Sequence, residues 1–403
     1  MEMVYLDNNA TTKPSPEVAA AVAEAHEALW ANPSSVHRFG QQVRQRMELA
    51  RASVASLIGA RPRELVFTSG GTEACALAIR GLIEARRGAG RFTVFTTGAE
   101  HAAVRELCDV IRDRDESGRS VVWLGNVEGG LVDVRSLREA LQELDGAALV
   151  NVQWANNETG VLQPLAEVAA AVAEARQAGK EVWLHTDATQ AVGKLPVDVA
   201  SAGVDLLSFA GHKFHGPKGV GALWIRRGVR LRPQQVGGPQ ETQRRGGTEN
   251  VPAVIGLGVA AQQASAFVGD TARVEALRGL RGRLEAEVQR GLASAGLSAA
   301  AVNSGGYPRL WNTTNLGFRG LEAEAILLGL SERGVCASAG AACSSGSLEP
   351  SPVLLAMGVE EAVAHGSIRL SLSRDTTVAE VDAASSSLVA VVERLAKVMP
   401  MGR

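Results

Sequence analysis

The sequence predicts an α/β protein with a mainly parallel sheet, followed by a smaller α+β region. Short apolar or β-branched runs alternate with longer, Ala-rich helical stretches through the middle of the chain. The runs lie at residues 65–68, 92–95, 121–124, 148–152 and 182–185. Short apolar runs separated by helices are typical of parallel strands that are buried on both faces.

After Pro252 the pattern changes to long helices and few strands. Residues 254–268 predict an apolar helix and residues 271–296 an amphipathic one, with short strands expected at 314–318 and 367–372. We therefore expect a large ligand-binding domain over residues 13–258. Residues 1–12 and 259–403 would form the small domain.

Composition limits the classes of function. The 403 residues are 46% hydrophobic and carry a net charge of −2 with a pI of about 6.4, so nothing favours binding to nucleic acid or to an anionic membrane. No continuous apolar run approaches the ~18 residues of a membrane span. The first residues lack the basic head of a secretory signal. Four scattered cysteines are too few for a disulfide framework, which favours a reduced, cytoplasmic setting.

Candidate ligand-binding residues stand where predicted strands end, because ligands of parallel sheets bind at the carboxyl ends of the strands. The strand at 65–68 leads through Gly70 and Gly71 into a helix near Thr72. Such a turn lets main-chain N–H groups and the helix dipole hold a phosphate, with Gly71 and Thr72 in contact. The alternative is an ordinary strand–helix turn.

Two charged residues follow later strands. Asp187 ends the strand at 182–185, where a buried carboxylate is costly unless it meets a cation such as a protonated pyridine nitrogen. Lys213 follows an apolar run, and a desolvated lysine can form a Schiff base with an aldehyde. Taken singly, Asp187 could cap a helix and Lys213 could be a surface residue. Their order after the phosphate turn matches the three anchors that pyridoxal 5′-phosphate (PLP) requires.

Three more residues fit the same site. His101 could lie over the cofactor ring and move protons, and Asn157 could bond the ring hydroxyl; either could instead be a turn residue. In residues 367–372 a period of two places Arg369 on the face opposite the aliphatic side chains. Arg369 could therefore grip a carboxylate with two parallel bonds, or lie on a solvated face.

A cysteine lies in a tract of small residues. Cys343 is surrounded by Ala, Gly and Ser between residues 337 and 347, a stretch that cannot pack a core and that we expect to be mobile. A thiol there favours reactivity, whereas Cys336 is expected to pack as a small apolar residue. The cysteine and histidine spacing argues against zinc, and the sequence offers no firm metal site, although Cys343 could share a transient iron–sulfur cluster with a scaffold protein.

With these residues and motifs the chain resembles the cysteine desulfurases of the NifS/IscS type, PLP-dependent members of the class V aminotransferase superfamily. The matching segments span essentially the whole chain and include the phosphate turn, the Asp187 and Lys213 strands and the Cys343 tract. They also include YLDNNATT at 5–12, NPSSVH at 32–37, NNETG at 156–160, RGGTEN at 245–250 and AHGSIR at 364–369.

The resemblance implies PLP fold type I and assigns each site residue. The implied cofactor contacts are Gly71, Thr72, His101, Asn157, Asp187, Gln190, Ala210, Gly211, His212, Lys213 and Thr248. Lys213 would be the cofactor lysine, Arg369 and Asn157 would bind the substrate, and Lys213, His101 and Cys343 would be catalytic. Thr248 would reach the cofactor of a neighbouring subunit, which implies a homodimer. Many relatives have serine where this chain has Ala210, so one phosphate bond is in question.

The implied reaction converts L-cysteine to L-alanine and leaves a persulfide on Cys343. An acceptor protein, such as a scaffold for iron–sulfur clusters, would then take the sulfur. Two alternatives stay open from the residues: a selenocysteine lyase or other class V aminotransferase-type enzyme, and a sulfur carrier with a vestigial PLP site. A cysteine within a Gly/Ser tract has no use in an aminotransferase, and the intact set of Asp187, Lys213 and Arg369 argues against a vestigial site.

Overall fold

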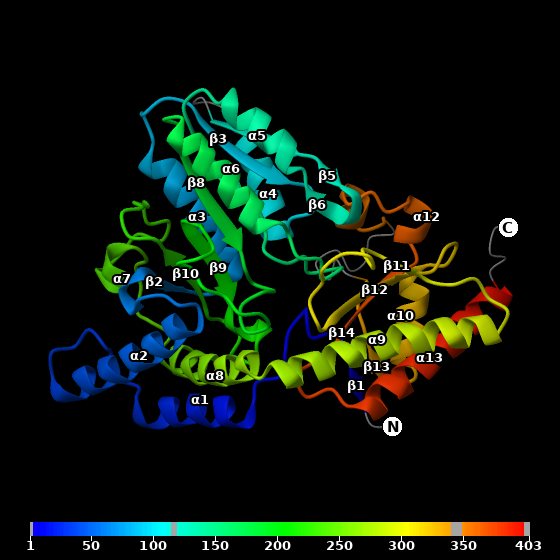
Figure 1. Cartoon of the computed structure of the whole chain (residues 1–403). Helices are drawn as coiled ribbons and strands as arrows, with labels where there is room; N and C mark the ends of the chain where they lie inside the picture. The colour runs from blue at the N-terminus through cyan, green and yellow to red at the C-terminus, as the bar shows by residue number, and fades with distance from the viewer. Residues whose placement is uncertain (1–2, 114–118, 340–348, 399–403) are drawn as a thin grey trace.

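A computed structural model describes residues 3–113, 119–339 and 349–398. A large α/β layer and a smaller α+β layer lie side by side, with the start of the chain running between them (Figure 1). The candidate site residues named above come from both layers, so the way the two layers are joined decides how these residues meet.

The large layer is built on a seven-stranded sheet of order β2-β10-β9-β8-β7-β3-β4. Its strands are β2 (Leu65–Thr68), β3 (Phe92–Thr97), β4 (Arg119–Leu124), β7 (Ala147–Asn151), β8 (Glu181–Asp187), β9 (Leu206–Ala210) and β10 (Gly221–Ile225). β10 is antiparallel to both of its neighbours, and the other pairs are parallel. The predicted mainly parallel α/β sheet is confirmed.

Helices cover both faces of this sheet, which explains why its strands are apolar on both sides. Helices α3 (Gly71–Ala85) and α4 (Ala102–Asp113) pack on one face. The other face is covered by α1 (Pro16–Ala28), α2 (Arg38–Leu57), α5 (Val134–Gln142), α6 (Leu165–Gln177) and α8 (Val251–Gly269). Successive residues of one strand reach opposite cores: Leu206 packs with α3 and Leu207 with the other group.

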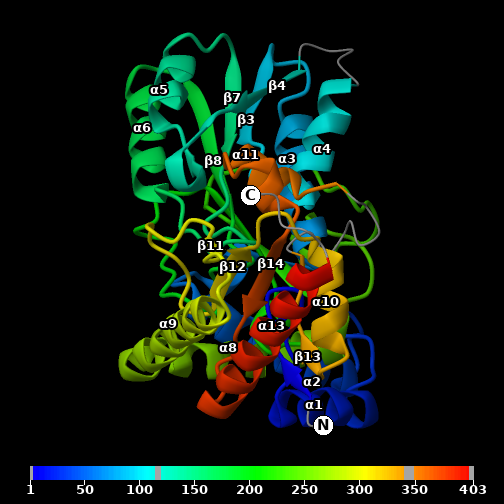
Figure 2. The same cartoon turned by 90° about the vertical axis from the view of Figure 1, so that its right-hand side faces the viewer.

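The smaller layer is a three-stranded antiparallel sheet with helices packed on it (Figure 2). Its strands are β11 (Ala301–Val302), β12 (Thr313–Gly317) and β14 (Ser367–Ser371). Helices α9 (Thr271–Ser294), α10 (Ala323–Ser331) and α13 (Val378–Val398) bury their apolar side chains against this sheet. Short helices α11 (Pro352–Ala356) and α12 (Glu361–Ala364) precede β14.

Two segments join the layers. Strand β1 (Val4–Tyr5) pairs in parallel with β13 (Val335–Cys336), so the N-terminal residues belong to the smaller layer before the chain enters the larger one. Helix α8 is the second connection: Ala264 packs in the large core and Phe267 in the small one. The predicted domain limit between residues 258 and 259 falls inside this helix.

Helix α8 has another property that bears on its surroundings. Among the described residues it is the one helix long and apolar enough to cross a membrane by length and composition. It packs against α1 and α2, and 61% of its apolar window is buried inside the protein. A largely buried core helix passes the same test of length and composition.

Candidate active site

A cavity of about 940 Å³ lies where strand ends of the large sheet meet the smaller layer. Ten of the residues predicted from the sequence line it: Gly71, Thr72, His101, Asn157, Asp187, Gln190, Ala210, His212, Lys213 and Arg369. All except Arg369 come from the large layer, at or after strand ends. The position agrees with the rule that ligands bind at the carboxyl ends of parallel strands.

Lys213 projects from a short turn directly after β9. This 3-10 turn, Gly211–Lys213, places the side chain at the cavity and not on the outer surface. The Lys213 Nζ donates to the main-chain oxygens of Asn9 and Ala10, at 2.8 Å each. The amine of Lys213 is therefore held by the N-terminal segment, over 200 residues away along the chain.

Asp187 ends β8 with a side chain that is buried beside the cavity, 7% exposed. Its Oδ1 accepts from the main-chain N–H of Thr189 at 2.9 Å, and residues 189–191 form a turn. The alternative that Asp187 caps a helix is wrong, because no helix follows it among the described residues of this segment. A buried carboxylate that faces a cavity fits a cationic ring nitrogen.

The start of α3, the predicted phosphate turn, forms one wall of the cavity. A Cβ added at Gly71 would lie 3.0 Å from Thr189 Oγ1 and 3.6 Å from the Ala210 Cβ, so this wall leaves little room for a side chain. The Thr189 Oγ1 is buried and has no hydrogen-bond partner among the described residues. Thr189 was not predicted from the sequence. Its hydroxyl and the Ala210 methyl both lie against the Cβ position of Gly71, at the wall of the cavity.

Two histidines at the cavity have lowered pKa values. The His101 Nδ1 accepts from the main-chain N–H of Ala103 at 3.1 Å, which leaves Nε2 for the cavity. Burial lowers the pKa of His101, although the charge of Asp187 opposes this. Burial first, and then the charge of Lys213, lower the pKa of His212 to about 4. An imidazole in this state can accept a proton from a neighbouring group at neutral pH.

Asn157 and Gln190 line the cavity near the N-terminal segment. The Asn157 Oδ1 is buried without a hydrogen-bond partner within the described ranges, which favours a polar ligand group beside it. Gln190 donates through Nε2 to the Asn9 main-chain oxygen at 3.0 Å. Asn157 is thus the better placed of the two to bond a ligand.

Arg369 is a buried arginine on β14, 2% exposed. Its Nη2 donates to Asp7 Oδ1 at 2.7 Å and its Nη1 to the Asn157 main-chain oxygen at 3.0 Å. The alternative of a solvated sheet face is wrong, because Ser367 and Ser371 are buried as well. Asp7, which orients the guanidinium, was not predicted.

Three predicted residues are not brought to this cavity. Gly211 is buried beneath it, where an added Cβ would lie 2.8 Å from Leu257 Cδ1. Thr248 is exposed and does not line the cavity of its own chain. Cys343 lies outside the described residues. On one side of that segment Ser338 exchanges main-chain hydrogen bonds with Arg369, and on the other Glu349 lines the cavity.

Comparison with known proteins shows the family to which this chain belongs. The family model described as aminotransferase class V matches residues 4–384. The chain belongs to the class V aminotransferase family. Cysteine desulfurase 2 of Trichormus variabilis is 46% identical over 400 residues, covering 99% of this chain and 96% of that protein. Cysteine desulfurase NifS of Azotobacter vinelandii is 43% identical over 402 residues, covering 99% of this chain and 95% of that one.

A solved structure supports the same assignment. A NifS-like protein superposes with a TM-score of 0.84 at 32% identity, covering 98% of this chain and all of the other. The predicted family, fold class and cysteine desulfurase activity are confirmed. Cysteine desulfurases of class V are PLP enzymes, and so is this chain.

The residues of this class V enzyme fit PLP. Gly71 and the first turn of α3 offer close main-chain N–H groups for a phosphate, Asp187 a carboxylate for the ring nitrogen, and Lys213 an amine for the aldehyde. The buried Asn157 Oδ1 and Thr189 Oγ1 remain for further polar groups of the ligand. The predicted PLP dependence thus agrees with the polar groups that this cavity presents.

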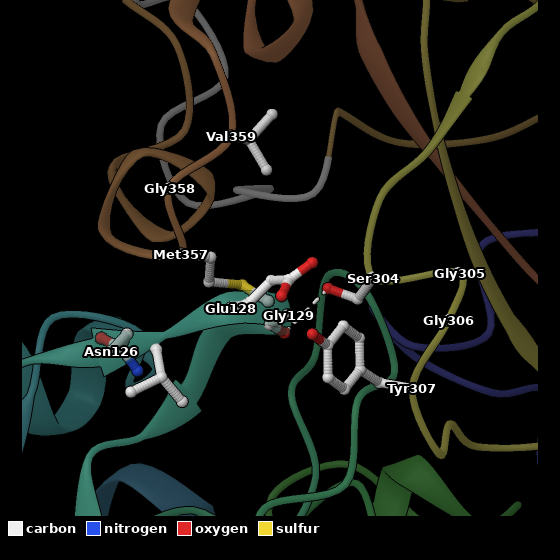
Figure 3. Close-up of a pocket in the computed structure, with 11 residues that line it drawn as sticks. Asn126, Glu128, Gly129, Ser304, Gly305, Gly306, Tyr307, Met357, Gly358 and Val359 are labelled. Atoms are coloured by element: carbon white, nitrogen blue, oxygen red, sulfur yellow. Dashed lines mark hydrogen bonds between the residues drawn. The ribbon is translucent and has the colours of Figure 1, made fainter.

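A second cavity, of about 480 Å³, lies at the seam between the two layers of the desulfurase (Figure 3). The Ser304 Oγ donates to the Gly129 main-chain oxygen at 3.0 Å, and the Tyr307 ring lies against Gly129. Met357 packs on Gly130 in the same way. Both glycines have positive φ, 78° and 79°, and leave space that the side chains of the smaller layer fill. This seam positions the smaller layer, which carries Arg369, against the sheet.

Proposed function

We propose that the cavity around Lys213 converts L-cysteine to L-alanine in a cytoplasmic homodimer. In this proposal Cys343 receives the sulfur as a persulfide and delivers it to an acceptor protein, such as a scaffold for iron–sulfur clusters. The observation that carries the proposal is that Lys213 and Arg369, an amine for the cofactor and a guanidinium for a carboxylate, line the same cavity.

In this proposal different residues of the cavity bind the substrate and move its protons. Bound PLP supplies an acceptor for the electron pair left when the substrate Cα loses its proton. Arg369 holds the α-carboxylate, with its own position fixed by Asp7 and the Asn157 carbonyl. The Lys213 amine, held at the Asn9 and Ala10 carbonyls, moves protons at the substrate, with His101, whose pKa burial lowers, as a second base.

Cys343 is proposed as the sulfur acceptor within the enzyme. Its thiolate attacks the substrate sulfur, so that an S–S bond forms as the C–S bond breaks, and protonation at carbon gives alanine. Both described ends of its segment lie at the active site, since Ser338 bonds the Arg369 main chain and Glu349 lines the cavity. Burial raises the pKa of the Cys75 thiol well above its usual range and that of Cys108 to about 12, which makes both poor nucleophiles.

The homodimer is supported by Thr248. The resemblance implies a phosphate contact from this residue, yet Thr248 is exposed and away from the cavity of its own chain. It could contribute only to the site of a second copy. Co-expression of a Lys213→Ala chain with a Thr248→Ala chain tests this, because mixed dimers contain one site with both residues intact. We expect mixed dimers to be more active than either homodimer, and equal activity would contradict a contribution from the second copy.

Two observations support the setting and the acceptor. Cys75, Cys108 and Cys336 are free thiols, as expected in a reducing compartment. The relative from Azotobacter vinelandii is named a NifS protein, and proteins of that type motivate the iron–sulfur acceptor. Copurification of a tagged enzyme after crosslinking tests the acceptor: recovery of an iron–sulfur scaffold is expected, and recovery of tRNA-thiolation proteins alone would redirect the proposal.

Replacement of Lys213 tests the catalytic assignment. We expect Lys213→Ala to remain folded and to lose both the visible absorbance of covalently bound PLP and alanine formation. Lys218→Ala is the matched control, because Lys218 is exposed in the same loop and does not line the cavity. A Lys213→Ala enzyme that still yields a borohydride-reducible link to PLP and normal turnover would overturn the assignment. Selenocysteine is assayed alongside cysteine, and a strong preference for it would favour a lyase.

A further inference from the structure

A second lysine is buried beneath the active site. Lys194 lies seven residues after the end of β8 and is 5% exposed. Its Nζ donates to Asn9 Oδ1 at 2.8 Å and to Gln190 Oε1 at 2.5 Å. No carboxylate of the described residues lies within ion-pair distance of it. A buried amine without a carboxylate is unusual, because removing an ammonium from water is costly.

Both acceptors of Lys194 belong to the wall of the PLP cavity. The main-chain oxygen of Asn9 accepts from Lys213 Nζ at 2.8 Å and from Gln190 Nε2 at 3.0 Å. The Asn9 Nδ2 donates to the Asn157 main-chain oxygen at 3.1 Å, and this oxygen also accepts from Arg369. Asn9 therefore contacts both the amine that takes up the cofactor and the carbonyl that orients the substrate arginine.

The chemistry of Lys194 suits a fixed hydrogen-bond donor. Burial, followed by the positive charges of Lys213 and Arg369, lowers the pKa of Lys194 well below its usual range. The Lys194 amine donates to two side-chain acceptors, Asn9 Oδ1 and Gln190 Oε1, so its N–H groups are used by the cavity wall. A methionine at position 194 would fill a similar volume without the cost of desolvating an amine. What lysine adds over methionine is therefore its hydrogen bonds.

Two residues of the smaller layer also donate to Asn9 and Lys194. Asn312 Nδ2 donates to the same Asn9 Oδ1 at 3.1 Å, and the Trp311 indole donates to the Lys194 main-chain oxygen at 3.0 Å. These two residues come from the smaller layer, whereas Lys194 comes from the large one. Lys194 thus ties the N-terminal segment and the smaller layer to the end of the large sheet, directly beside Lys213.

We propose that Lys194 is a positioning residue. It acts through Asn9 and Gln190 to fix the Asn9 main-chain oxygen, which accepts a hydrogen bond from the Lys213 amine. The proposal rests on the proposed role of Lys213 as the cofactor lysine. Lys194 touches neither cofactor nor substrate in this account. Its effect is to keep the Lys213 amine in one place when that amine is not linked to PLP.

The capture of PLP by apoenzyme tests this directly. Mixing apoenzyme with PLP and following the visible absorbance reports how fast the Lys213 amine reaches the aldehyde. We expect Lys194→Met to slow this step and kcat each by about three- to tenfold, as loss of a buried hydrogen bond predicts. Lys180→Met is the matched control: Lys180 precedes the opposite end of β8 and donates to the Leu144 main-chain oxygen at 2.8 Å. We expect wild-type rates from it.

A mutant cycle identifies the route. Because Lys194 acts through Asn9 and Gln190, adding Lys194→Met to the Asn9→Ala/Gln190→Ala variant is expected to slow PLP capture no further than that variant alone. Effects that multiply would overturn the proposal, as would wild-type capture in Lys194→Met with only a lower melting temperature. If Lys194→Met does not fold, wild-type capture by Asn9→Ala/Gln190→Ala overturns the proposal and slowed capture supports it. A visible band that persists in Lys213→Ala would instead contradict the role of Lys213.

Discussion

Replacing Arg369 with alanine is expected to weaken cysteine binding and to destabilise the fold, for separate reasons. The guanidinium is 2% exposed and donates to Asp7 Oδ1 at 2.7 Å, while the Asp7 side chain is 20% exposed. Removing one partner of a buried ion pair costs about 3–5 kcal/mol because the other charge stays behind. Since Asp7 retains some contact with water, we expect a loss near the lower end, roughly 3 kcal/mol of unfolding free energy.

The effect on binding follows from the substrate carboxylate. Loss of a bidentate, charge-assisted partner removes about 1.5–3 kcal/mol, which corresponds to a rise in KM of roughly 10- to 150-fold. Arg369→Lys keeps the charge without the planar fork, so its KM is expected to lie between those of wild type and Arg369→Ala. KM is measured from alanine formation against cysteine concentration, and stability from urea unfolding of the apoenzyme.

Asp7→Asn separates the two effects. In the double variant Asp7→Asn/Arg369→Ala no charge is left unpaired, so we expect the unfolding free energy to recover while KM stays high. Recovery of both quantities would show that Arg369 serves only to neutralise Asp7. An unchanged KM in Arg369→Ala would refute its role in holding the carboxylate.

Three further predictions address the thiol, the cofactor cradle and the buried histidine. Cys343→Ala is expected to bind PLP and cysteine yet release almost no sulfur, whereas Cys336→Ala is expected to keep most of its activity. Limited alkylation followed by peptide mapping shows which thiol reacts, and labelling mainly at Cys336 would contradict the prediction. Gly71→Ala is expected to raise the dissociation constant for PLP about tenfold, since its Cβ would lie 3.0 Å from a threonine hydroxyl; Gly282→Ala, with open space around it, is expected to leave fluorescence titrations unchanged. Burial lowers the pKa of His185 to about 4, so its contribution to stability is complete above pH 6.5 and is lost as the pH falls toward 4. The loss is at most roughly 3 kcal/mol, and His185→Gln is expected to flatten unfolding free energy over that range; an unchanged pH dependence would contradict it.

The sheet could be predicted because its signal is local. Each apolar run is short, is bounded by helices and is buried on both faces, as β8 and β9 show. The same locality revealed Asp187 and Lys213, which stand at strand ends where the topology alone brings them together. Arg369 was recognisable as a carboxylate ligand on β14, but periodicity could not decide whether its face was buried.

The residues that hold those side chains were beyond sequence reasoning. Asn9 contacts Lys213, Asp7 contacts Arg369, and Lys194 reaches back to Asn9, all across large separations along the chain. Polar residues of this kind form no periodic pattern in the sequence. A lysine is also expected to be exposed, because lysines are rarely buried in proteins. Thr189 was missed for a simpler reason. Its hydroxyl matters because it is buried at the cavity without a hydrogen-bond partner among the described residues, and burial of a polar turn residue cannot be read from the sequence.

The position of the N-terminal segment has a consequence for how the enzyme is made. Asp7 and its partner Arg369 are 362 residues apart, and the bridge from Asp7 to Ser371 closes the same contact in the main chain. A ribosome adding about 5–20 residues per second needs tens of seconds between the two. Until Arg369 has been made, the Asp7 carboxylate lacks this ion-pair partner, so the arginine end of the cavity is completed last.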